Sequence, residues 1–279
     1  MSTPAVSVLM PVVNPHAVFF REAVQSVLAQ SFANFELVIV EDPSLSEAAP
    51  ILGAIADGRV RLIRNAERTG LVRQLNQGLR ECRSEFVARM DADDVAVPER
   101  FRQQVELLTR CPDVAVVGSQ LQIIDEAGRS RGYRTYPVNH DDILTSFPRY
   151  NPLAHPSVMF RRSVVVAAGG YTADLHNEDY DLWSRLAVDG HRFANLPDAQ
   201  LRYRVHSGAV KSTRLRTMIR GTLEVKERYW RSRMTPRDRL RLFGERCLLT
   251  LPPRLVMAMF KRTAYRTRLD VPAVAAEHP

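Results

Sequence analysis

Short apolar runs alternate with amphipathic stretches through the first 110 residues, and this alternation limits the fold more than any other feature. Four runs have the length and composition of buried strands: 6–13, 35–40, 60–64 and 85–88. Three stretches between them carry apolar residues at helical spacing: 17–28, 46–56 and 71–82. Strands that alternate with helices in this way predict an α/β fold with a mostly parallel, Rossmann-like central sheet flanked by helices.

An acidic segment, Asp91-Ala92-Asp93-Asp94, follows the fourth of these strands. Ligands bind at the C-terminal ends of the strands in open α/β sheets. Asp91 and Asp93 have one residue between them, so on an extended backbone both side chains point the same way. Such a pair favours a divalent cation, Mn²⁺ or Mg²⁺, which can hold a diphosphate. The spacing is equally typical of a solvated acidic turn, with Asp94 near the start of the next helix.

Three other chemically suggestive residues also fall at predicted strand ends, namely Pro11, Asn14 and Asp42. This agreement favours a ligand site over a solvated turn. No glycine-rich phosphate loop follows the first strand, so we expect phosphates to be bound through a metal rather than through backbone amides.

The second half of the chain changes character. Strands are predicted at 114–118, 121–124, 157–160 and 201–206. Asn177 can cap a helix whose first turn contains Glu178, Asp179 and Asp181. Those carboxylates either complement the helix dipole or place a base at the site. His206 ends the last strand, where a lone histidine is more often a surface residue than a ligand.

Basic residues are concentrated in the last quarter of the chain. Residues 211–279 contain 17 Lys and Arg but 6 Asp and Glu, an excess of +11, although the whole chain carries +8. This predicts a basic helical extension, 213–279, on a nearly neutral body. Residues 214–268 either bind an anionic membrane surface or pack on the body. The arginines lie among apolar residues without an aromatic platform, so we expect no nucleic-acid partner.

Several features predict a cytoplasmic location, peripheral at the inner face of the membrane. The three cysteines are widely spaced, which is typical of a reducing compartment. The N-terminus has no basic flank typical of a signal peptide. No apolar run reaches the roughly 18 residues of a spanning helix.

Six stretches, in this order, resemble the family 2 glycosyltransferases, which have a GT-A fold: VSVLMPVVN, FELVIVED, ARMDADDVAVPERF, AHPSVMFRR, NEDYDLWSRLA and LRYRVHSGAVKS. The resemblance implies a catalytic domain over 1–212, with a nucleotide-binding half (1–118) and an acceptor half (119–212). It also implies inverting transfer from a nucleotide-sugar donor, typically a UDP-sugar, to a hydroxyl of a saccharide or lipid-linked acceptor. Cell-surface polysaccharide or glycolipid synthesis is the expected setting.

The resemblance further implies roles for single residues on the donor side. Asp42 would bind the base, typically uracil, and Pro11 would form a wall against it. Asn14 and Ala92 would also border the nucleotide. Two positions depart from the family pattern: Val13 replaces the usual aromatic, and Glu41-Asp42-Pro43-Ser44 replaces the usual Asp-Asp-Gly-Ser.

The metal and acceptor sides follow from the same resemblance. Asp91 and Asp93 would lie around the ribose and the metal, with Asp93 as the direct ligand and His206 as a late one. Asp179 would be the general base. Three residues are expected on the acceptor side: His155, Glu178 and Trp183.

Two other functions fit parts of the pattern. A sugar-nucleotide nucleotidyltransferase also combines an α/β sheet with metal-binding carboxylates, but it should carry a basic, glycine-rich loop after the first strand. The segment Val12-Val13-Asn14-Pro15-His16 is not such a loop. A non-catalytic sugar-nucleotide-binding module would be favoured by loss of Asp93 or Asp179, and both are present.

Overall fold

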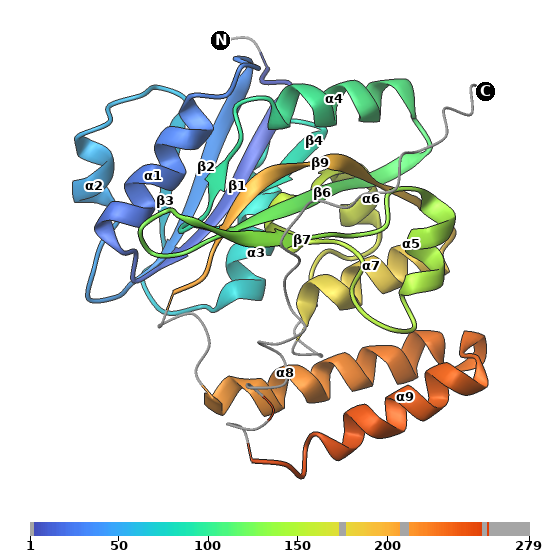
Figure 1. Cartoon of the computed structure of the whole chain (residues 1–279). Helices are drawn as coiled ribbons and strands as arrows, with labels where there is room; N and C mark the ends of the chain where they lie inside the picture. Colours follow the sequence, from blue (N-terminus) through green and yellow to red (C-terminus); the bar gives the residue numbers. More distant parts are fainter. Residues whose placement is uncertain (1–2, 173–176, 207–211, 253–255, 257–279) are drawn as a thin grey trace.

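The computed structural model describes residues 3–172, 177–206, 212–252 and 256. A nine-stranded sheet with the order β3-β2-β1-β4-β8-β6-β9-β5 forms its centre, and β7 pairs with β6 (Figure 1). The strands are β1 (Val6–Val13), β2 (Phe35–Asp42), β3 (Val60–Arg64), β4 (Phe86–Arg89), β5 (Val95–Ala96), β6 (Val114–Ile124), β7 (Ser130–Arg134), β8 (Met159–Arg161) and β9 (Arg192–Arg204).

Helices cover the sheet on both faces (Figure 1). The α-helices are α1 (Ala17–Leu28), α2 (Ala49–Gly53), α3 (Leu71–Glu81), α4 (Arg100–Arg110), α5 (His140–Ser146), α6 (Arg162–Ala167), α7 (Glu178–Val188), α8 (Ser212–Val225) and α9 (Pro236–Cys247). Shorter helical turns are η1 (His155–Ser157), η2 (Lys226–Trp230) and η3 (Arg231–Arg233). Among the described residues, no helix combines the length and the apolar character that crossing a bilayer requires.

The parallel half of the sheet agrees with the strand–helix alternation in the sequence. Strands β1 to β4 run parallel, and their registers bring Val13 beside Asp42 and Leu9 beside Arg89. Alternate residues of β1 enter different cores, with Met10 on the α1 side and Leu9 on the α3 side. Such alternation is expected of a strand that is buried on both faces. The C-terminal ends of the four strands therefore meet at one edge.

The other half of the sheet differs from its prediction. Strand β8 runs antiparallel to both β4 and β6, and β9 runs parallel to β6. The two strands expected between 114 and 124 are one strand, β6. Strand β9 begins at Arg192 rather than near 201, because its register shifts opposite Ser119 and Gln120 and accommodates Pro197 there. Its C-terminal end still reaches the edge where β1, β2 and β4 end.

The segment after the acidic residues also departs from its prediction. Helix α4 begins at Arg100, so Asp94 does not lie near the start of the next helix, as a solvated acidic turn would have placed it. Between the acidic residues and α4, the short strand β5 pairs with β9, and Val95 lies opposite Arg202. The acidic residues therefore lie in a turn between two strands of the same sheet.

Helix α8 and η2 pack on the body through apolar side chains. Trp230 is buried, its ring stacks on that of Phe147 at a centroid distance of 4.9 Å, and its Nε1 donates to Ser184 Oγ. Leu223 and Val225 are buried as well. Packing on the body is therefore the finding for this part of the extension. The rest of the predicted segment 214–268, from residue 253 onward, lies outside the described residues, except for the buried Val256.

Candidate active site

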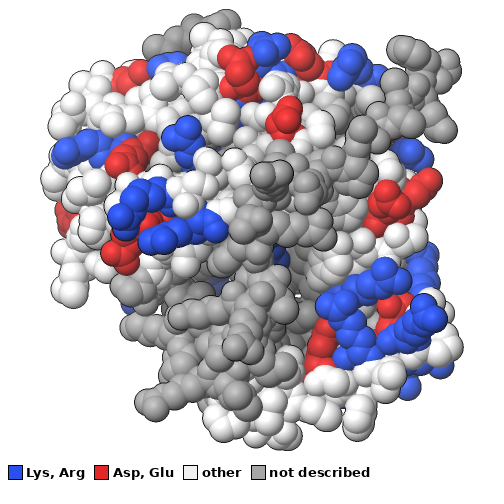
Figure 2. All heavy atoms as spheres, viewed as in Figure 1, with Lys and Arg blue, Asp and Glu red and all other residues white. Residues whose placement is uncertain are grey.

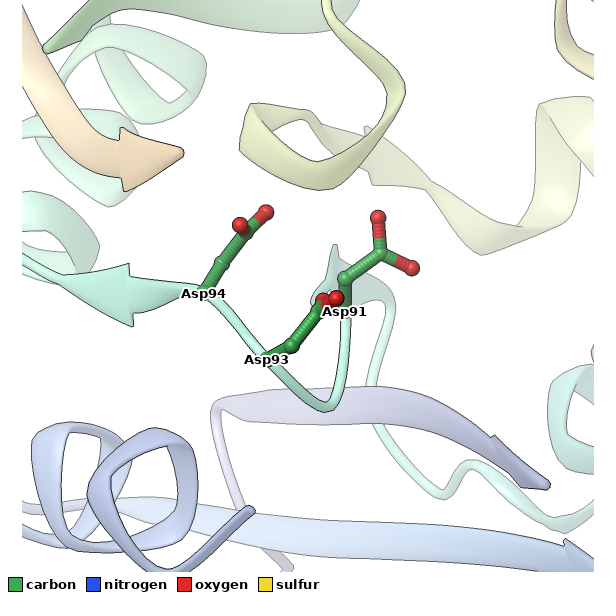
Figure 3. A group of neighbouring side chains, drawn as sticks. All are labelled: Asp91, Asp93 and Asp94. Carbon is green, nitrogen blue, oxygen red and sulfur yellow. The ribbon is translucent and has the colours of Figure 1, made fainter. Parts of the chain in front are cut away.

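Three carboxylates converge on the turn between β4 and β5. Asp91, Asp93 and Asp94 each offer an oxygen, and these atoms lie within 4.8 Å of one another (Figure 3). The backbone here is a turn, not the extended strand from which the convergence of Asp91 and Asp93 was expected. The turn brings in Asp94 as a third member, which the sequence analysis had placed at a helix start.

The three carboxylates of this turn lie close together, and they are partly shielded from water. His206 Nε2 lies 3.0 Å from Asp93 Oδ2, so the end of β9 brings this histidine to the predicted partner. Burial and the negative charge of Asp91 raise the pKa of Asp93. Asp94 is buried, and its Oδ2 has no hydrogen-bond partner in the described part of the chain. Burial and the two neighbouring charges raise the pKa of Asp94 well above its ordinary value.

This donor set fits a divalent cation. Hard cations take oxygen ligands, and the three carboxylates offer oxygens from one short turn. The raised pKa values of Asp93 and Asp94 reflect in part the repulsion that a cation would relieve. The unpartnered oxygen of Asp94 is the buried acceptor that such a group would satisfy.

Arg204 anchors the acidic turn, a role that the sequence analysis missed. Its backbone N–H donates to Asp94 Oδ1 at 2.8 Å, and its Nε donates to the carbonyl of Asp93 at 2.9 Å. The guanidinium also pairs with Glu22 and lies over the ring of Phe19. One side chain thus joins β9, the acidic turn and α1.

Arg89 is a second residue that the sequence analysis missed. It ends β4, it is 4% exposed, and its Nη1 lies 2.6 Å from Asp91 Oδ2. Its positive charge also acts on the acidic pair of α7, where it opposes the effect of burial on the pKa values of Glu178 and Asp179. The signal in the sequence was an arginine at the end of an otherwise apolar strand.

Asp179 lies in the first turn of α7 with its carboxylate oriented by two donors. Asn151 Nδ2 donates to its Oδ2 and the backbone N–H of Tyr180 to its Oδ1, both at 2.8 Å. Burial raises the pKa of Asp179. Asn177 does not cap α7 as expected, because its Nδ2 donates to Met218 O and Thr222 Oγ1 of α8.

Glu178 forms the second half of this acidic pair. Burial and the charge of Asp179 raise the pKa of Glu178 to about 7. Its Oε1 lies 3.8 Å from His155 Nδ1, and His155 Nε2 lies 3.0 Å from the hydroxyl of Tyr171. Burial, with the nearby charge of Arg89, holds the pKa of His155 well below its usual range. The imidazole of His155 is therefore neutral. It lies beside the carboxyl group of Glu178 without adding a positive charge there.

Two residues of α7 that the sequence offered for the site are buried: Trp183, expected on the acceptor side, and Asp181, one of three possible bases. Trp183 is 0% exposed, and its ring packs edge-on against His155 and tilted against Phe160, so it is a residue of the core. Helix α7 is buried on most of its surface, so both of its aromatic residues, Tyr180 and Trp183, enter the core. Asp181 is also buried, with partners in Thr172, Arg185 and Tyr229.

Asp42 occupies the end of β2, but its carboxylate already has four donors. Asn65 Nδ2 and Thr69 Oγ1 donate to one oxygen, and the backbone N–H groups of Thr69 and Gly70 to the other. Burial alone would raise the pKa of Asp42, but these hydrogen bonds outweigh it and lower the pKa. The direct structural role of Asp42 is to hold the loop that precedes α3.

The other predicted nucleotide-side residues lie along the same edge. Pro11 is buried inside β1 opposite Val40. Asn14 follows β1 with a φ of 50°, and its N–H donates to Ser44 Oγ at 2.8 Å. Ala92 is half-buried in the acidic turn. The residues predicted for the donor side therefore come from the ends of β1, β2 and β4.

Comparison with known families decides what this site belongs to. The model of the family described as "Glycosyl transferase family 2" matches residues 7–167, which is more than half of the chain. The chain belongs to glycosyltransferase family 2. This assignment makes it a glycosyltransferase and favours sugar transfer over the nucleotidyltransferase alternative.

Proteins similar to this chain are named as glycosyltransferases, some of them of amylovoran or O-antigen biosynthesis. The amylovoran biosynthesis glycosyltransferase AmsE of Erwinia amylovora is 35% identical over 199 residues, covering 70% of this chain and 73% of the relative. A UDP-Gal:alpha-D-GlcNAc-diphosphoundecaprenol beta-1,3-galactosyltransferase of Escherichia coli is 28% identical over 194 residues, covering 67% of this chain and 70% of the relative.

A solved structure with the same fold is that of the mannosyltransferase PcManGT from Pyrobaculum calidifontis, in complex with GDP-Man and Mn²⁺. It superposes with a TM-score of 0.64 at 17% identity, covering 95% of this chain and 77% of that one. This likeness confirms the predicted fold, a mixed α/β GT-A architecture with a curled central sheet flanked by helices.

Proposed function

We propose that this glycosyltransferase moves a sugar from a UDP-sugar to a hydroxyl of a saccharide or lipid-linked acceptor, with inversion at the anomeric carbon. The observation that carries the proposal is that Arg89 lies between two acidic groups, pairing with Asp91 and acting on the Glu178–Asp179 pair. A cation site for a diphosphate and a carboxylate pair for an acceptor thus share one edge of the sheet. UDP is favoured by the resemblance and by the donor that the name of the galactosyltransferase relative contains.

On the donor side, Asp91 and Asp93 would hold Mn²⁺ or Mg²⁺, with Asp94 behind them and His206 at Asp93. The bound ion would supply positive charge against the diphosphate as it leaves. The protein's own part is to keep the turn in place. Arg204 does so from β9. Asp42 would fix the loop beside which the base binds, with Pro11, Asn14 and Ala92 along the nucleotide.

On the acceptor side, the carboxylate of Asp179 would accept the proton of the attacking hydroxyl. The new bond to the anomeric carbon forms on the face opposite the diphosphate, which departs with the electrons of the broken bond. A single displacement of this kind inverts the configuration. Asn151 and the N–H of Tyr180 hold the carboxylate in one orientation. Near neutral pH, Glu178 retains its proton in part and can donate a hydrogen bond to the acceptor.

The decisive experiment separates donor binding from turnover. Asp179→Asn should leave UDP affinity with Mn²⁺ unchanged in calorimetry and lower turnover by about 10²–10⁴-fold, the usual effect of a positioned base. Asp189→Asn, at the exposed end of the same helix, is the matched control and should be fully active. Unchanged turnover in Asp179→Asn rejects this base. Donor binding by the wild type without any transfer would instead support a non-catalytic sugar-nucleotide-binding module.

The proposal also includes a location. We place the enzyme in the cytoplasm, attached peripherally to the inner face of the membrane through the part of residues 214–268 that follows the packed α8 and η2. The basic excess of +11 in 211–279 supports an anionic surface as the partner. The name of the diphosphoundecaprenol-dependent relative supports a lipid-linked acceptor.

A further inference from the structure

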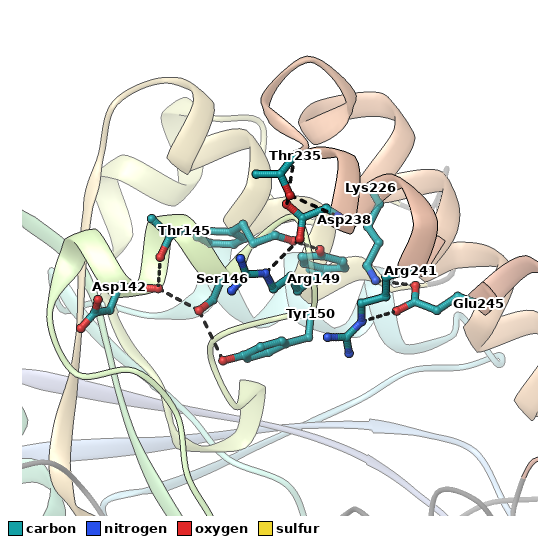
Figure 4. Close-up of polar contacts among 12 residues, drawn as sticks. Asp142, Thr145, Ser146, Arg149, Tyr150, Lys226, Thr235, Asp238, Arg241 and Glu245 are labelled. Atoms are coloured by element: carbon teal, nitrogen blue, oxygen red, sulfur yellow. Dashed lines mark hydrogen bonds and ion pairs between the residues drawn. The ribbon is translucent and has the colours of Figure 1, made fainter. Parts of the chain in front are cut away.

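Helix α9 is attached to the protein by its polar face. Asp238 pairs with Arg149 of the body at 3.0 Å, and Glu245 pairs with the buried Lys226 at 2.6 Å (Figure 4). Asp238 is the only residue of α9 that is fully buried, and Leu242 adds a partly buried apolar contact. A helix packed on a globular core ordinarily places its apolar face inward, so this orientation is reversed.

The outward face of α9 is consequently apolar. Leu240 is 72% exposed and Phe243 is 64% exposed, and Cys247 is exposed one turn further on. Their spacing of three and four residues places them on one stripe of the helix. Large apolar side chains that are exposed side by side mark an interaction surface.

Arginines line both sides of this stripe. At 100° per residue, Arg237 and Arg241 flank it on one side, and Arg239 and Arg246 flank it on the other. All four are exposed. Arg241 and Arg246 form ion pairs with Glu245 and Glu227, whereas Arg237 and Arg239 have no acidic partner within the described residues. Figure 2 shows basic side chains gathered on the part of the surface where Figure 1 places α8 and α9.

The stripe is connected to the acceptor side of the active site. Asn177, next to the Glu178–Asp179 pair, is hydrogen-bonded to Met218 and Thr222 of α8. Helix α8 in turn packs against α9. A surface that binds α9 would therefore lie on the side of the molecule where the acceptor is expected.

We infer that α9 is an interfacial helix that inserts Leu240 and Phe243 into an anionic lipid surface. An apolar stripe with arginines on both flanks matches the boundary between acyl chains and anionic head groups, where arginine stems remain apolar while their guanidinium groups meet phosphates. The inference rests on the proposed membrane location and deepens it, because it names the face and the residues that make the contact.

Vesicle sedimentation of the full chain tests the inference. Wild-type protein should co-sediment with vesicles of phosphatidylglycerol mixed with phosphatidylcholine, and only weakly with phosphatidylcholine alone. Leu240→Ser combined with Phe243→Ser should weaken this binding about tenfold or more, because two apolar groups no longer enter the interface. Arg237→Glu combined with Arg239→Glu should weaken it by more than roughly 30-fold, because the loss of two basic residues alone gives that factor and the new carboxylates are repelled. High salt should also weaken binding of the wild type.

Matched controls change the same residue types elsewhere. Val166→Ser combined with Val188→Ser removes exposed apolar groups from α6 and α7, and Arg80→Glu combined with Arg110→Glu makes the same charge change on α3 and α4. Both controls should bind as the wild type does, and melting temperatures should show that every variant folds. Equal losses in the controls, or no vesicle binding by the wild type, would overturn the inference.

Two further measurements separate the alternatives. A concentration-dependent dimer that Leu240→Ser and Phe243→Ser abolish would assign the stripe to a second copy of the chain and overturn a lipid partner. Turnover with a water-soluble acceptor, measured without vesicles, should be the same in the α9 variants and the wild type. If vesicles are bound but no sugar is transferred, the proposed reaction fails while the role of α9 stands.

Discussion

The buried guanidinium of Arg89 lies 2.6 Å from the carboxylate of Asp91, so a fixed cation of the protein already faces the acidic turn. Arg89→Met removes this charge and leaves Asp91, Glu178 and Asp179 without it. We expect a loss of about 3–5 kcal/mol in the free energy of unfolding, the usual cost of removing one partner of a buried pair. Urea denaturation measures it.

A conservative change provides the control for Arg89. Arg89→Lys keeps the charge and should recover a large part of the lost stability, although a lysine cannot reproduce the planar guanidinium. If Arg89→Met and Arg89→Lys were equally destabilised, packing rather than charge would be the contribution of this residue.

The second prediction concerns the cation. Asp93→Asn should weaken UDP binding in the presence of Mn²⁺ by about tenfold or more, because it removes a charged oxygen ligand, while weak binding without metal should hardly change. Calorimetry with and without Mn²⁺ separates the two. The control is Asp113→Asn. Asp113 is exposed and pairs with Arg192, and its substitution should have no effect in either titration. Equal UDP affinities for Asp93→Asn and the wild type would reject Asp93 as a ligand.

The third prediction concerns pH. The pKa of Glu178 is about 7 in the folded protein, because of burial and of the charge of Asp179, whereas about 4.3 is usual in an unfolded chain. Since the unfolded chain releases this proton first, the contribution of Glu178 to stability falls as pH rises from about 4 to about 7. Glu178→Gln should therefore gain stability over the wild type across that window, on the order of 3 kcal/mol at its upper end.

Chemical denaturation at several pH values checks this gain. The exposed Glu224→Gln on α8 serves as the control and should follow the wild type at every pH. A Glu178→Gln variant whose stability relative to the wild type is independent of pH would show that the carboxyl titrates normally.

The fourth prediction concerns the attachment of the C-terminal helices. Trp230→Ala removes the stack on Phe147 and the hydrogen bond to Ser184, and it should cost about 3–5 kcal/mol in the free energy of unfolding. Trp230→Phe should cost less because a ring remains, and Arg231→Ala at the exposed neighbouring position should be close to neutral. A small loss for Trp230→Ala would mean that α8 and η2 contribute little to the folded body.

The parallel half of the sheet was predictable because each strand is followed by a helix with a regular apolar pattern. The region around β9 was not, because Pro197 lies at an irregularity of the ladder and reads as the end of a strand. Strand β5 has two residues, too few for any periodic signal, yet its pairing with β9 determines where the acidic turn lies.

In the site, the residues that sequence reasoning could find were those with a motif or a charge at a strand end. The structure brings Asp93 and His206 together, although 113 positions separate them. The position of Arg89 at the end of an apolar strand is unusual, but neither Arg89 nor Arg204 could be assigned to the site, because a single arginine carries no spacing pattern. Trp183 was misassigned because α7 is buried on most sides, so periodicity does not indicate which aromatic faces a ligand.

The bond from the N–H of Arg204 to Asp94 spans 110 positions, and it has a consequence for biosynthesis. While the ribosome is still making the middle of the chain, β1 to β4 can already pair with one another, but the acidic turn has neither β9 nor Arg204 to hold it. Contacts between distant positions form late in folding. The nascent protein would therefore be unable to position a diphosphate until β9 has emerged, and a fragment ending at residue 118 would possess the strands of the nucleotide side without its cation site.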